Sequence, residues 1–357
     1  MTTDNCINVS WEVAKFLLPA AAKGDEEAMM LLCKLAVPSW SDVTSKDFKM
    51  EALGGGFSGN VPIKCSAPGV EGAPTLAVKI NASDDDEENE DGNKDSLVTA
   101  AYRRWSAAGI VPTVFCLGRP EAPGLEVYEF IEGSQASWLV VKHGPEFMEN
   151  DLDAASFGKI YAELHGQDSE WYEEYKDCLK GQWEDWQKGM DTNEYATEVR
   201  AKYGCVASMI VLFGDNHAHM GKNAAGAAKA AKELSPLLHE YLPKNSLLGR
   251  TVVGHGDAHG ANIMHRRDGG HGDLVVIDLD FVGRMPAAYD LGTPLAGTTV
   301  GPYAFLFNKG DKLGKYPSLA QRRIVAQAYL DELGAEAQKF SRNEIEEVVL
   351  DMEVGVA

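Results

Sequence analysis

The spacing of apolar residues predicts helices and strands in a definite order along the chain. In residues 11–35 apolar side chains recur every three or four positions, which predicts two helices broken near Pro19 and Gly24. In residues 48–80 short apolar runs alternate with glycines and polar residues, which predicts strands. Residues 96–109 predict a further helix that ends near Gly109, and strands follow it.

The rest of the chain has mostly helical periodicity, at residues 157–167, 223–242 and 318–334. Two apolar, strand-like runs interrupt it, in the segments VVGHGDAHGANIM and LVVIDLD. The pattern therefore predicts an α+β chain with three parts. These are a helical extension at 1–44, a small β-rich N-lobe at 45–132, and a larger, mostly helical C-lobe at 133–357.

Composition narrows the classes of protein to which this chain can belong. The 357 residues are 45% hydrophobic and 24% charged, which is ordinary for a globular protein with a buried core. The net charge of −21 argues against nucleic-acid or anionic-membrane binding, because both need a positive surface. The acidic loop at 83–95 alone contributes about −7. It is interpreted as a solvated loop, with a docking site for a basic partner as the alternative.

The pattern of cysteines and the lack of targeting signals both favour the cytoplasm. The six cysteines are scattered without CxxC pairs, which indicates free thiols in a reducing environment. The first residues lack a basic segment followed by an apolar one, and no run of eighteen apolar residues occurs. These features predict a cytoplasmic protein without membrane insertion.

The two strand-like runs of the predicted C-lobe are expected to be adjacent strands, and the acidic residues at their ends point to phosphoryl transfer from ATP. Asp257 follows the first run, where a loop can project its carboxylate to orient a substrate hydroxyl as the catalytic base. Asn262 offers a neutral oxygen to Mg²⁺, which prefers oxygen ligands. Asp278 ends the second run, where a charge beside a buried strand needs a cation. Asp280 is either a second metal-side carboxylate or a cap of the turn. The alternative for Asp257 and Asn262 is that they only shape a turn.

The predicted N-lobe carries residues suited to nucleotide binding. The turn GGGFSGN, with Gly55, Gly56 and Ser58, lets backbone N–H groups approach phosphates closely. Lys79, in the strand that follows, can reach the α- and β-phosphates of ATP, and a surface lysine on an edge strand is the alternative. At the end of the N-lobe the backbone at Glu129 and Ile131 can hydrogen-bond the adenine edge, unless this is an ordinary strand.

Histidines beside Asp257 suggest a rival chemistry. His255, Asp257 and His259 alternate at period two, so an extended segment would point all three in one direction. With Asp278 they would form a metallohydrolase site. That reading leaves Lys79 and the glycine turn unexplained, so a structural His255 that braces the catalytic loop is favoured.

In their order along the chain, GGGFSGN, AVKI, VYEFIEG, HGDAHGAN, VIDLDF and YDLG resemble the family of aminoglycoside phosphotransferases and choline/ethanolamine kinases. The resemblance covers roughly residues 37–334 and implies the bilobal protein-kinase-like fold. It implies Asp257 as catalytic base, Asn262 and Asp278 as Mg²⁺ ligands and Lys79 as the phosphate-binding lysine. It also implies that Asn60 lies near the nucleotide.

Two stretches, VPSWSDVTSKDFKMEALGGGFSGNVPIKCS and KYPSLAQRRIVAQAYL, resemble choline/ethanolamine kinases in particular. The chain also departs from that family. A Glu usually lies in the helix after the lysine strand, whereas this chain has Val98 and its neighbours there, with Asp95 as the nearest acid. Choline kinases use a tryptophan-rich C-terminal helix to bind the quaternary ammonium. This chain has no tryptophan after Trp186 and offers other aromatic residues instead: Trp171, Tyr172, Tyr175, Tyr303, Phe305 and Phe307.

The expected function is ATP- and Mg²⁺-dependent phosphorylation of the hydroxyl of a small amino alcohol, choline or ethanolamine first, which implies a role in phospholipid biosynthesis. A homodimer is consistent with this expectation. One alternative is a kinase for another small alcohol, such as an aminoglycoside or a sugar. The other is a pseudokinase that binds nucleotide without turnover. The missing helix Glu favours the pseudokinase, whereas Asp257, Asn262 and Asp278 argue against it.

Overall fold

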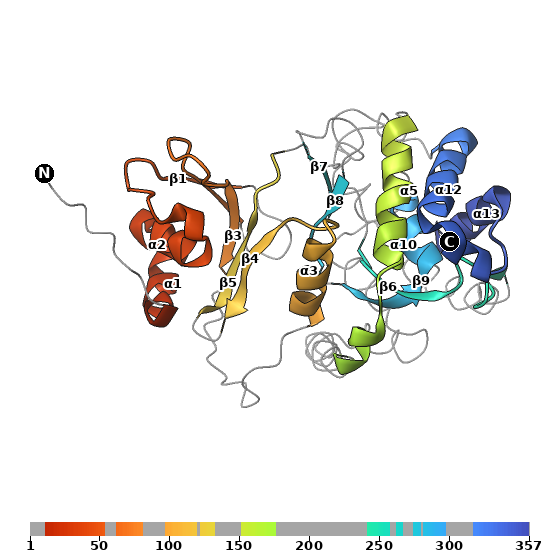
Figure 1. Cartoon of the computed structure of the whole chain (residues 1–357), viewed down its shortest axis with the longest axis horizontal. Coiled ribbons are helices and arrows are strands. Elements are labelled where there is room, and N and C mark those ends of the chain that lie inside the picture. Colours follow the sequence, from red (N-terminus) through yellow and green to blue (C-terminus); the bar gives the residue numbers. More distant parts are fainter. Residues whose placement is uncertain are drawn as a thin grey trace, which may run out of the picture. The chain divides into compact units, whose positions relative to one another are not determined.

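The structure is a computed structural model of the whole chain (Figure 1). The residues that it describes are 11–53, 62–80, 97–119, 122–132, 151–175, 241–257, 262–266, 274–279, 281–297 and 317–356. The chain divides into two compact units, Met1–Glu132 and Gly133–Ala357. The glycine turn, the acidic loop and Asp280 lie outside the described residues.

An antiparallel five-stranded sheet with the order β1-β2-β3-β5-β4 forms the centre of the first unit. Its strands are β1 (Lys49–Ala52), β2 (Ile63–Ser66), β3 (Leu76–Ile80), β4 (Val114–Arg119) and β5 (Ala122–Glu129). The run LAVKI forms the central strand β3 because it is rich in branched residues and alternates in burial. This strand carries Lys79.

Two helices cover one face of this sheet: α1 (Ala14–Ala22) and α2 (Glu26–Ala36) (Figure 1). Short 3-10 turns flank them at Trp11–Val13 and Pro38–Trp40. Gly24, at φ +90°, makes the break between the helices, and the Asp25 side chain caps α2 by accepting from Ala28 N at 2.9 Å. The prediction that Pro19 also marks the break is wrong, because α1 continues through it.

The apolar core of the first unit lies between these helices and the sheet. Leu76 and Val78 of β3 and Leu125 and Val127 of β5 are fully buried there against α2 side chains. Because successive residues of a strand point to opposite faces, the residues between them point to the other face. Helix α3 (Leu97–Ala107) packs on that second face through Tyr102, whose ring lies 5.0 Å from the ring of Tyr128.

The second unit is mostly helical, with two short strand pairs among its helices. The helices are α5 (Asp151–His165), α10 (Ala287–Gly297), α12 (Leu319–Leu333) and α13 (Ile345–Val356), with 3-10 turns at Glu170–Glu174 and Gly334–Lys339. The strands are β6 (Thr251–Gly254), β7 (Ile263–His265), β8 (Leu274–Val276) and β9 (Gly283–Pro286). β6 pairs with β9, and β7 pairs with β8. The expectation that β6 and β8 are neighbouring strands is therefore wrong.

Helix α5 lies directly against α12 (Figure 1). A Cβ atom at Gly158 would collide with the Val325 carbonyl oxygen, so glycine permits this close approach. The helix predicted at 318–334 is confirmed as α12, and Ser318 caps it in a capping box with Gln321. The pattern did not predict α10 and α13, and the helix predicted at 223–242 lies almost entirely outside the described residues.

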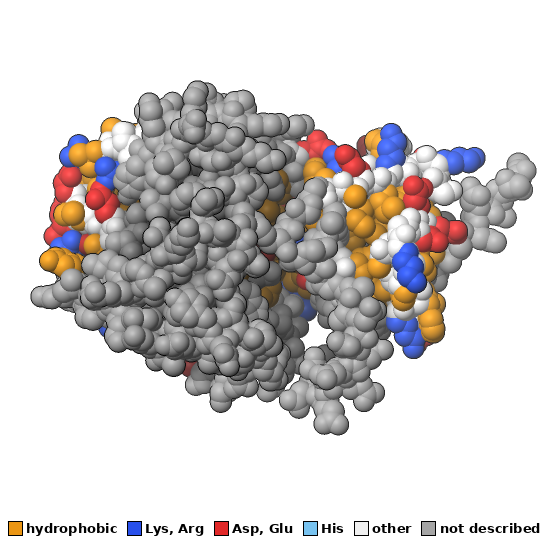
Figure 2. Space-filling model, turned by 180° about the vertical axis from the view of Figure 1, so that it is seen from behind, with side chains coloured by type: hydrophobic (Ala, Val, Ile, Leu, Met, Phe, Trp, Pro, Cys, Tyr) orange, Lys and Arg blue, Asp and Glu red, His pale blue; other side chains and the backbone are white. Residues whose placement is uncertain are grey.

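Charges of both signs occupy the described surface of the first unit, seen from behind in Figure 2, with hydrophobic side chains between them. The acidic loop lies outside the described residues, so its interpretation as a solvated loop stays a prediction. Within the described ranges, no helix is both long enough and apolar enough to span a bilayer.

Candidate active site

The turn that follows β6 presents Asp257. β6 ends at Gly254, and His255, Gly256 and Asp257 follow. Gly256 has φ +80°, and a Cβ atom there would collide with the Phe281 carbonyl oxygen. Only glycine meets both conditions without strain, which explains its place directly before Asp257.

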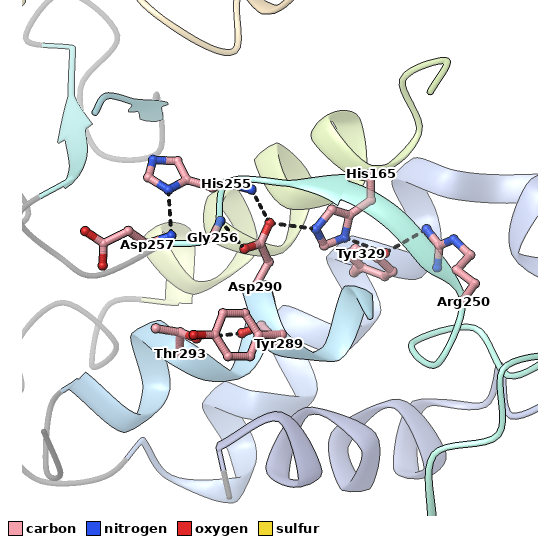
Figure 3. Close-up of polar contacts among 9 residues, drawn as sticks. All are labelled: His165, Arg250, His255, Gly256, Asp257, Tyr289, Asp290, Thr293 and Tyr329. Atoms are coloured by element: carbon pink, nitrogen blue, oxygen red, sulfur yellow. Dashed lines mark hydrogen bonds and ion pairs between the residues drawn. The ribbon is translucent and has the colours of Figure 1, made fainter. Parts of the chain in front are cut away.

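The buried carboxylate of Asp290, on α10, holds this turn through hydrogen bonds to its backbone (Figure 3). Asp290 Oδ2 accepts a hydrogen bond from His255 N at 2.6 Å, and its Oδ1 accepts one from Gly256 N at 2.9 Å. Asp290 is fully buried. Two charge-assisted bonds to consecutive N–H groups fix the direction in which the backbone leaves the turn. Asp290 is the acid of the YDLG motif, and the sequence did not predict a role for it.

Asp290 is itself the end of a buried chain of hydrogen bonds (Figure 3). His165 Nε2 lies 3.3 Å from Asp290 Oδ2, and His165 Nδ1 lies 2.9 Å from the Tyr329 hydroxyl. Arg250 donates to the same hydroxyl at 2.8 Å. One arrangement satisfies every group: Tyr329 donates to Nδ1 of a neutral His165, whose Nε2–H donates to Asp290. None of these three residues was predicted, because none follows a strand-like run.

The pKa values in this chain agree with that arrangement. Burial lowers the pKa of His165, and the bond to Asp290 opposes it without restoring the usual value, so the ring stays neutral. Burial alone would raise the pKa of Asp290, but the bond from His165 and the N–H of Gly256 outweigh it and hold that pKa below its usual value. Burial also raises the pKa of Tyr329 to about 12.

The free energy of unfolding is expected to fall as the pH drops from 7.5 to 5. Unfolded His165 takes up a proton near pH 6.5, whereas the folded ring resists protonation, so the unfolded state binds more protons. This contribution is complete above about pH 6.5 and is lost below it, by at most about 1.4 kcal/mol per pH unit. Urea unfolding at several pH values measures the slope. A His165→Gln variant, though less stable throughout, is expected to show a shallower slope, and an unchanged slope would contradict the assignment.

Both ring nitrogens of His255 are engaged in bracing the turn. Nε2 lies 2.8 Å from the Ile277 carbonyl oxygen, and Nδ1 accepts from Asp257 N at 3.2 Å. A ring with both nitrogens in hydrogen bonds to backbone has none left for a metal, which argues against the metallohydrolase. His259, the other histidine of that alternative, lies outside the described residues.

Asn262 joins Asp257 to the second strand-like run. Its Nδ2 donates to the Asp257 carbonyl oxygen at 2.9 Å and to Asp257 Oδ2 at 3.3 Å. Its backbone oxygen accepts from Ile277 N at 2.8 Å, beside the β7–β8 pair. Asp278 is the next residue, so tertiary pairing brings Asp257, Asn262 and Asp278 into one neighbourhood.

The side-chain oxygens of Asn262 and Asp278 are chemically suited to binding a Mg²⁺ ion. Asp278 is partly buried and has φ +65°, a left-handed conformation that is uncommon outside glycine and that clusters at functional sites. Because Asn262 uses its Nδ2 toward Asp257, its Oδ1 is the atom of that amide suited to a cation. Asp278 and Asn262 are the oxygen donors that Mg²⁺ prefers. In the described part of the chain no three His, Cys, Asp or Glu side chains form a metal cluster. An ion held by two protein oxygens, waters and phosphates is consistent with that finding.

The residues predicted to bind the nucleotide lie in the first unit. Lys79 is partly buried on β3. The Glu129 side chain accepts from Thr113 N at 3.1 Å and Oγ1 at 2.9 Å, so it ties β5 to the start of β4. Ile131 is buried. Gly55, Gly56, Ser58 and Asn60 lie outside the described residues.

A second lysine, Lys64, lies near this segment, and the sequence did not predict a role for it. Lys64 Nζ lies 4.4 Å from the Phe130 ring centroid and 3.3 Å from Glu132 Oε1. It lies on β2 opposite Ala77 of β3. Its contacts hold the end of the first unit in place.

An aromatic cluster follows α5, where the sequence suggested a replacement for a quaternary-ammonium cage. The Trp171 ring lies 6.2 Å from that of Tyr172 and 6.0 Å from that of Tyr175. The Arg284 guanidinium, however, lies 5.0 Å from the Tyr172 ring centroid, so a protein cation already occupies this ring. Tyr172 is therefore a poor ring for such a cage. Tyr303, Phe305 and Phe307 lie outside the described residues.

Comparison with known proteins identifies relatives of this chain. Residues 97–302, more than half of the chain, match the Phosphotransferase enzyme family. No curated protein sequence matches. Among solved structures, choline kinase from Cryptosporidium parvum Iowa II is similar with a TM-score of 0.56 and 13% identity, covering 92% of this chain and 85% of that one. Plasmodium vivax ethanolamine kinase is similar with a TM-score of 0.54 and 16% identity, covering 99% and 89%. These similarities confirm the predicted α+β, protein-kinase-like fold.

Proposed function

The chain belongs to the Phosphotransferase enzyme family, and we propose that it is an ATP- and Mg²⁺-dependent kinase that phosphorylates the hydroxyl of a small amino alcohol, choline or ethanolamine first. The observation that carries this proposal is the environment of Asp257. Its backbone is fixed through Asp290 and His255, and Asn262 ties it to the strand pair that leads to Asp278. The family match at 97–302 includes all of these residues.

In the proposed reaction Asp257 orients the acceptor hydroxyl and takes up its proton. The hydroxyl oxygen forms a bond to the γ-phosphorus of ATP, and ADP leaves with the electron pair of the broken P–O bond. Asn262 and Asp278 would hold Mg²⁺, which supplies charge neutralisation on the phosphates when bound. Lys79 would bind the α- and β-phosphates. A pre-set turn lowers the cost of orienting these groups in the transition state.

The choice of acceptor rests on the sequence. The two stretches that resemble choline/ethanolamine kinases in particular favour a small amino alcohol, and a cationic acceptor suits a chain with net charge −21. The Arg284 guanidinium lies over the Tyr172 ring, which argues against a quaternary-ammonium cage built on that ring. This favours ethanolamine over choline, because ethanolamine needs hydrogen-bond acceptors rather than an aromatic cage. Aminoglycoside and sugar acceptors remain the alternatives.

The experiment that tests the function is ATP consumption by the full chain with Mg²⁺ against ethanolamine, choline, other amino alcohols, aminoglycosides and sugars. Acceptor-dependent release of ADP, with a phosphorylated amino alcohol detected by mass spectrometry, is the expected result. Phosphorylation of only an aminoglycoside or sugar would replace the proposed acceptor. Binding of Mg²⁺-ATP without transfer to any alcohol would favour the pseudokinase.

An Asp278→Asn variant is expected to lose at least about 100-fold in kcat/KM and to need more Mg²⁺ for half-maximal rate, because ligation of the metal is worth several kcal/mol. Asparagine tolerates the left-handed backbone at φ +65°, so the variant should unfold at the wild-type temperature. A titration of rate against Mg²⁺ concentration measures the effect. Asp278→Ala removes the side-chain oxygens and strains the backbone, so its Tm should also fall. Wild-type Mg²⁺ dependence in Asp278→Asn would exclude Asp278 as a ligand.

A further inference from the structure

Lys79 is assigned to phosphate binding by the proposed function, and a lysine with that task must be held in one direction. Its side chain has four rotatable bonds, so a neighbouring carboxylate that fixes the ammonium lowers the entropy lost on binding. The nearest helix in the chain, α3, consists of LVTAAYRRWSA and contains no acidic residue. Its buried positions are apolar or aromatic: Leu97, Ala100, Ala101, Tyr102 and Trp105. Within the described residues of α3, none can therefore be the ionic partner of Lys79.

The register of the sheet places a carboxylate directly opposite this lysine. β3 and β5 are antiparallel neighbours, and Lys79 is the register partner of Glu126. Directly opposed residues of an antiparallel pair point to the same face with Cβ atoms about 5 Å apart, within reach of a lysine–glutamate contact. Val78 and Val127, which come next to them in sequence, point into the core beneath α1 and α2. Lys79 and Glu126 thus share the opposite face, the face on which α3 packs.

A contact from the same strand holds Glu126 in place. The hydroxyl of Tyr128, two residues along β5 and on the same face, donates to Glu126 Oε2 at 2.8 Å. The ring of Tyr128 packs against Tyr102 of α3, with centroids 5.0 Å apart and planes at 45°. A carboxylate accepts up to four hydrogen bonds, so the bond from Tyr128 is compatible with an ammonium on the same group.

We propose that Glu126 is the positioning residue for Lys79, and that α3 acts on this pair through Tyr102 and Tyr128 rather than through an acid of its own. The inference deepens the proposed function, because it rests on Lys79 binding the phosphates. It has a physical consequence. A lysine that pairs with Glu126 is oriented by two neighbouring strands of the sheet, so its direction does not depend on an ion pair with a helix.

Measurement of Mg²⁺-ATP affinity by the full chain tests this inference, with Glu126→Gln, Lys79→Met and the double variant forming a cycle. Glu126→Gln keeps the size of the side chain and the acceptor for Tyr128 but removes the charge. It is expected to weaken binding about 10-fold. In the Lys79→Met background the same change is expected to have no further effect, because Glu126 acts only through Lys79. A purely structural role would instead give the same loss in both backgrounds.

Two more variants sharpen the result. Tyr128→Phe removes only the hydroxyl that holds Glu126, so it should weaken Mg²⁺-ATP binding by a smaller factor, about 3-fold. This variant replaces Glu126→Gln as the test if Glu126→Gln does not fold. Asp95→Asn, at the nearest acid before α3, is the matched control and should bind as wild type does. Weakened binding by Asp95→Asn with wild-type binding by Glu126→Gln would overturn the inference while leaving the function intact. Failure of the wild-type chain to bind Mg²⁺-ATP would overturn both.

Discussion

An Asp257→Asn variant is expected to transfer phosphate about 10²- to 10⁴-fold more slowly than wild type, the usual contribution of a positioned general base. The variant should keep its fold. The turn is held through backbone groups, because Asp290 accepts from the N–H of Gly256 and Asn262 donates to the Asp257 carbonyl oxygen. The asparagine amide occupies the same volume but cannot accept the hydroxyl proton. The loss should therefore appear in kcat, with little change in the KM for ATP.

Steady-state rates with the best acceptor measure this loss, and thermal unfolding checks that the fold is retained. Asp331→Asn is the matched control, because Asp331 is an exposed carboxylate on α12 that accepts from Gln327. Its removal should leave the rate unchanged. Turnover by Asp257→Asn within a few-fold of wild type would show that another group serves as the base.

An Asp290→Asn variant is expected to lose both stability and activity. Asp290 is fully buried and accepts from His255 N, from Gly256 N and from the His165 ring. An amide offers only one acceptor atom, so its NH₂ group must face at least one of these donors. Breaking a buried, charged contact of this kind costs about 3 kcal/mol. Because the same bonds fix the turn before Asp257, kcat should fall as well.

Urea unfolding gives the change in stability, and the rate at a temperature where both proteins stay folded gives the effect on catalysis. The control is Thr293→Ala on the same helix, where the hydroxyl donates to the Tyr289 carbonyl oxygen at 2.8 Å. That variant should lose less than about 1 kcal/mol and keep its activity. Equal stability of Asp290→Asn and wild type would show that the carboxylate charge does not hold the turn.

Local patterns predicted the parts of the chain whose chemistry follows from neighbours in sequence. The apolar runs before Asp257 and Asp278 identified short strands, and glycines and acids after a strand indicate a turn that presents side chains. The helix at 318–334 likewise follows from apolar residues three or four positions apart. The fold class followed from the order of these elements. The roles of Asp257 and Asp278 stay predictions that the experiments above test, and the role of Asn262 stays a prediction as well.

The local pattern did not predict how the strands pair. Strand periodicity says which face a side chain occupies but not which strand lies beside it, so β6 was assigned the wrong neighbour. The same gap concealed the register that sets Lys79 opposite Glu126. An acid on β5 has no local signal that distinguishes it from a surface glutamate.

The amino-acid sequence alone therefore indicated the fold class and the phosphotransferase family, and it predicted Asp257, Asn262 and Asp278 as site residues, because each prediction depends on short-range spacing. The support of those residues depends on the tertiary fold. His165 meets Asp290 across 125 residues and Tyr329 across 164, and no local pattern links positions so far apart. Burial then makes the contacts strong, since a polar group removed from water must find its partner inside the protein.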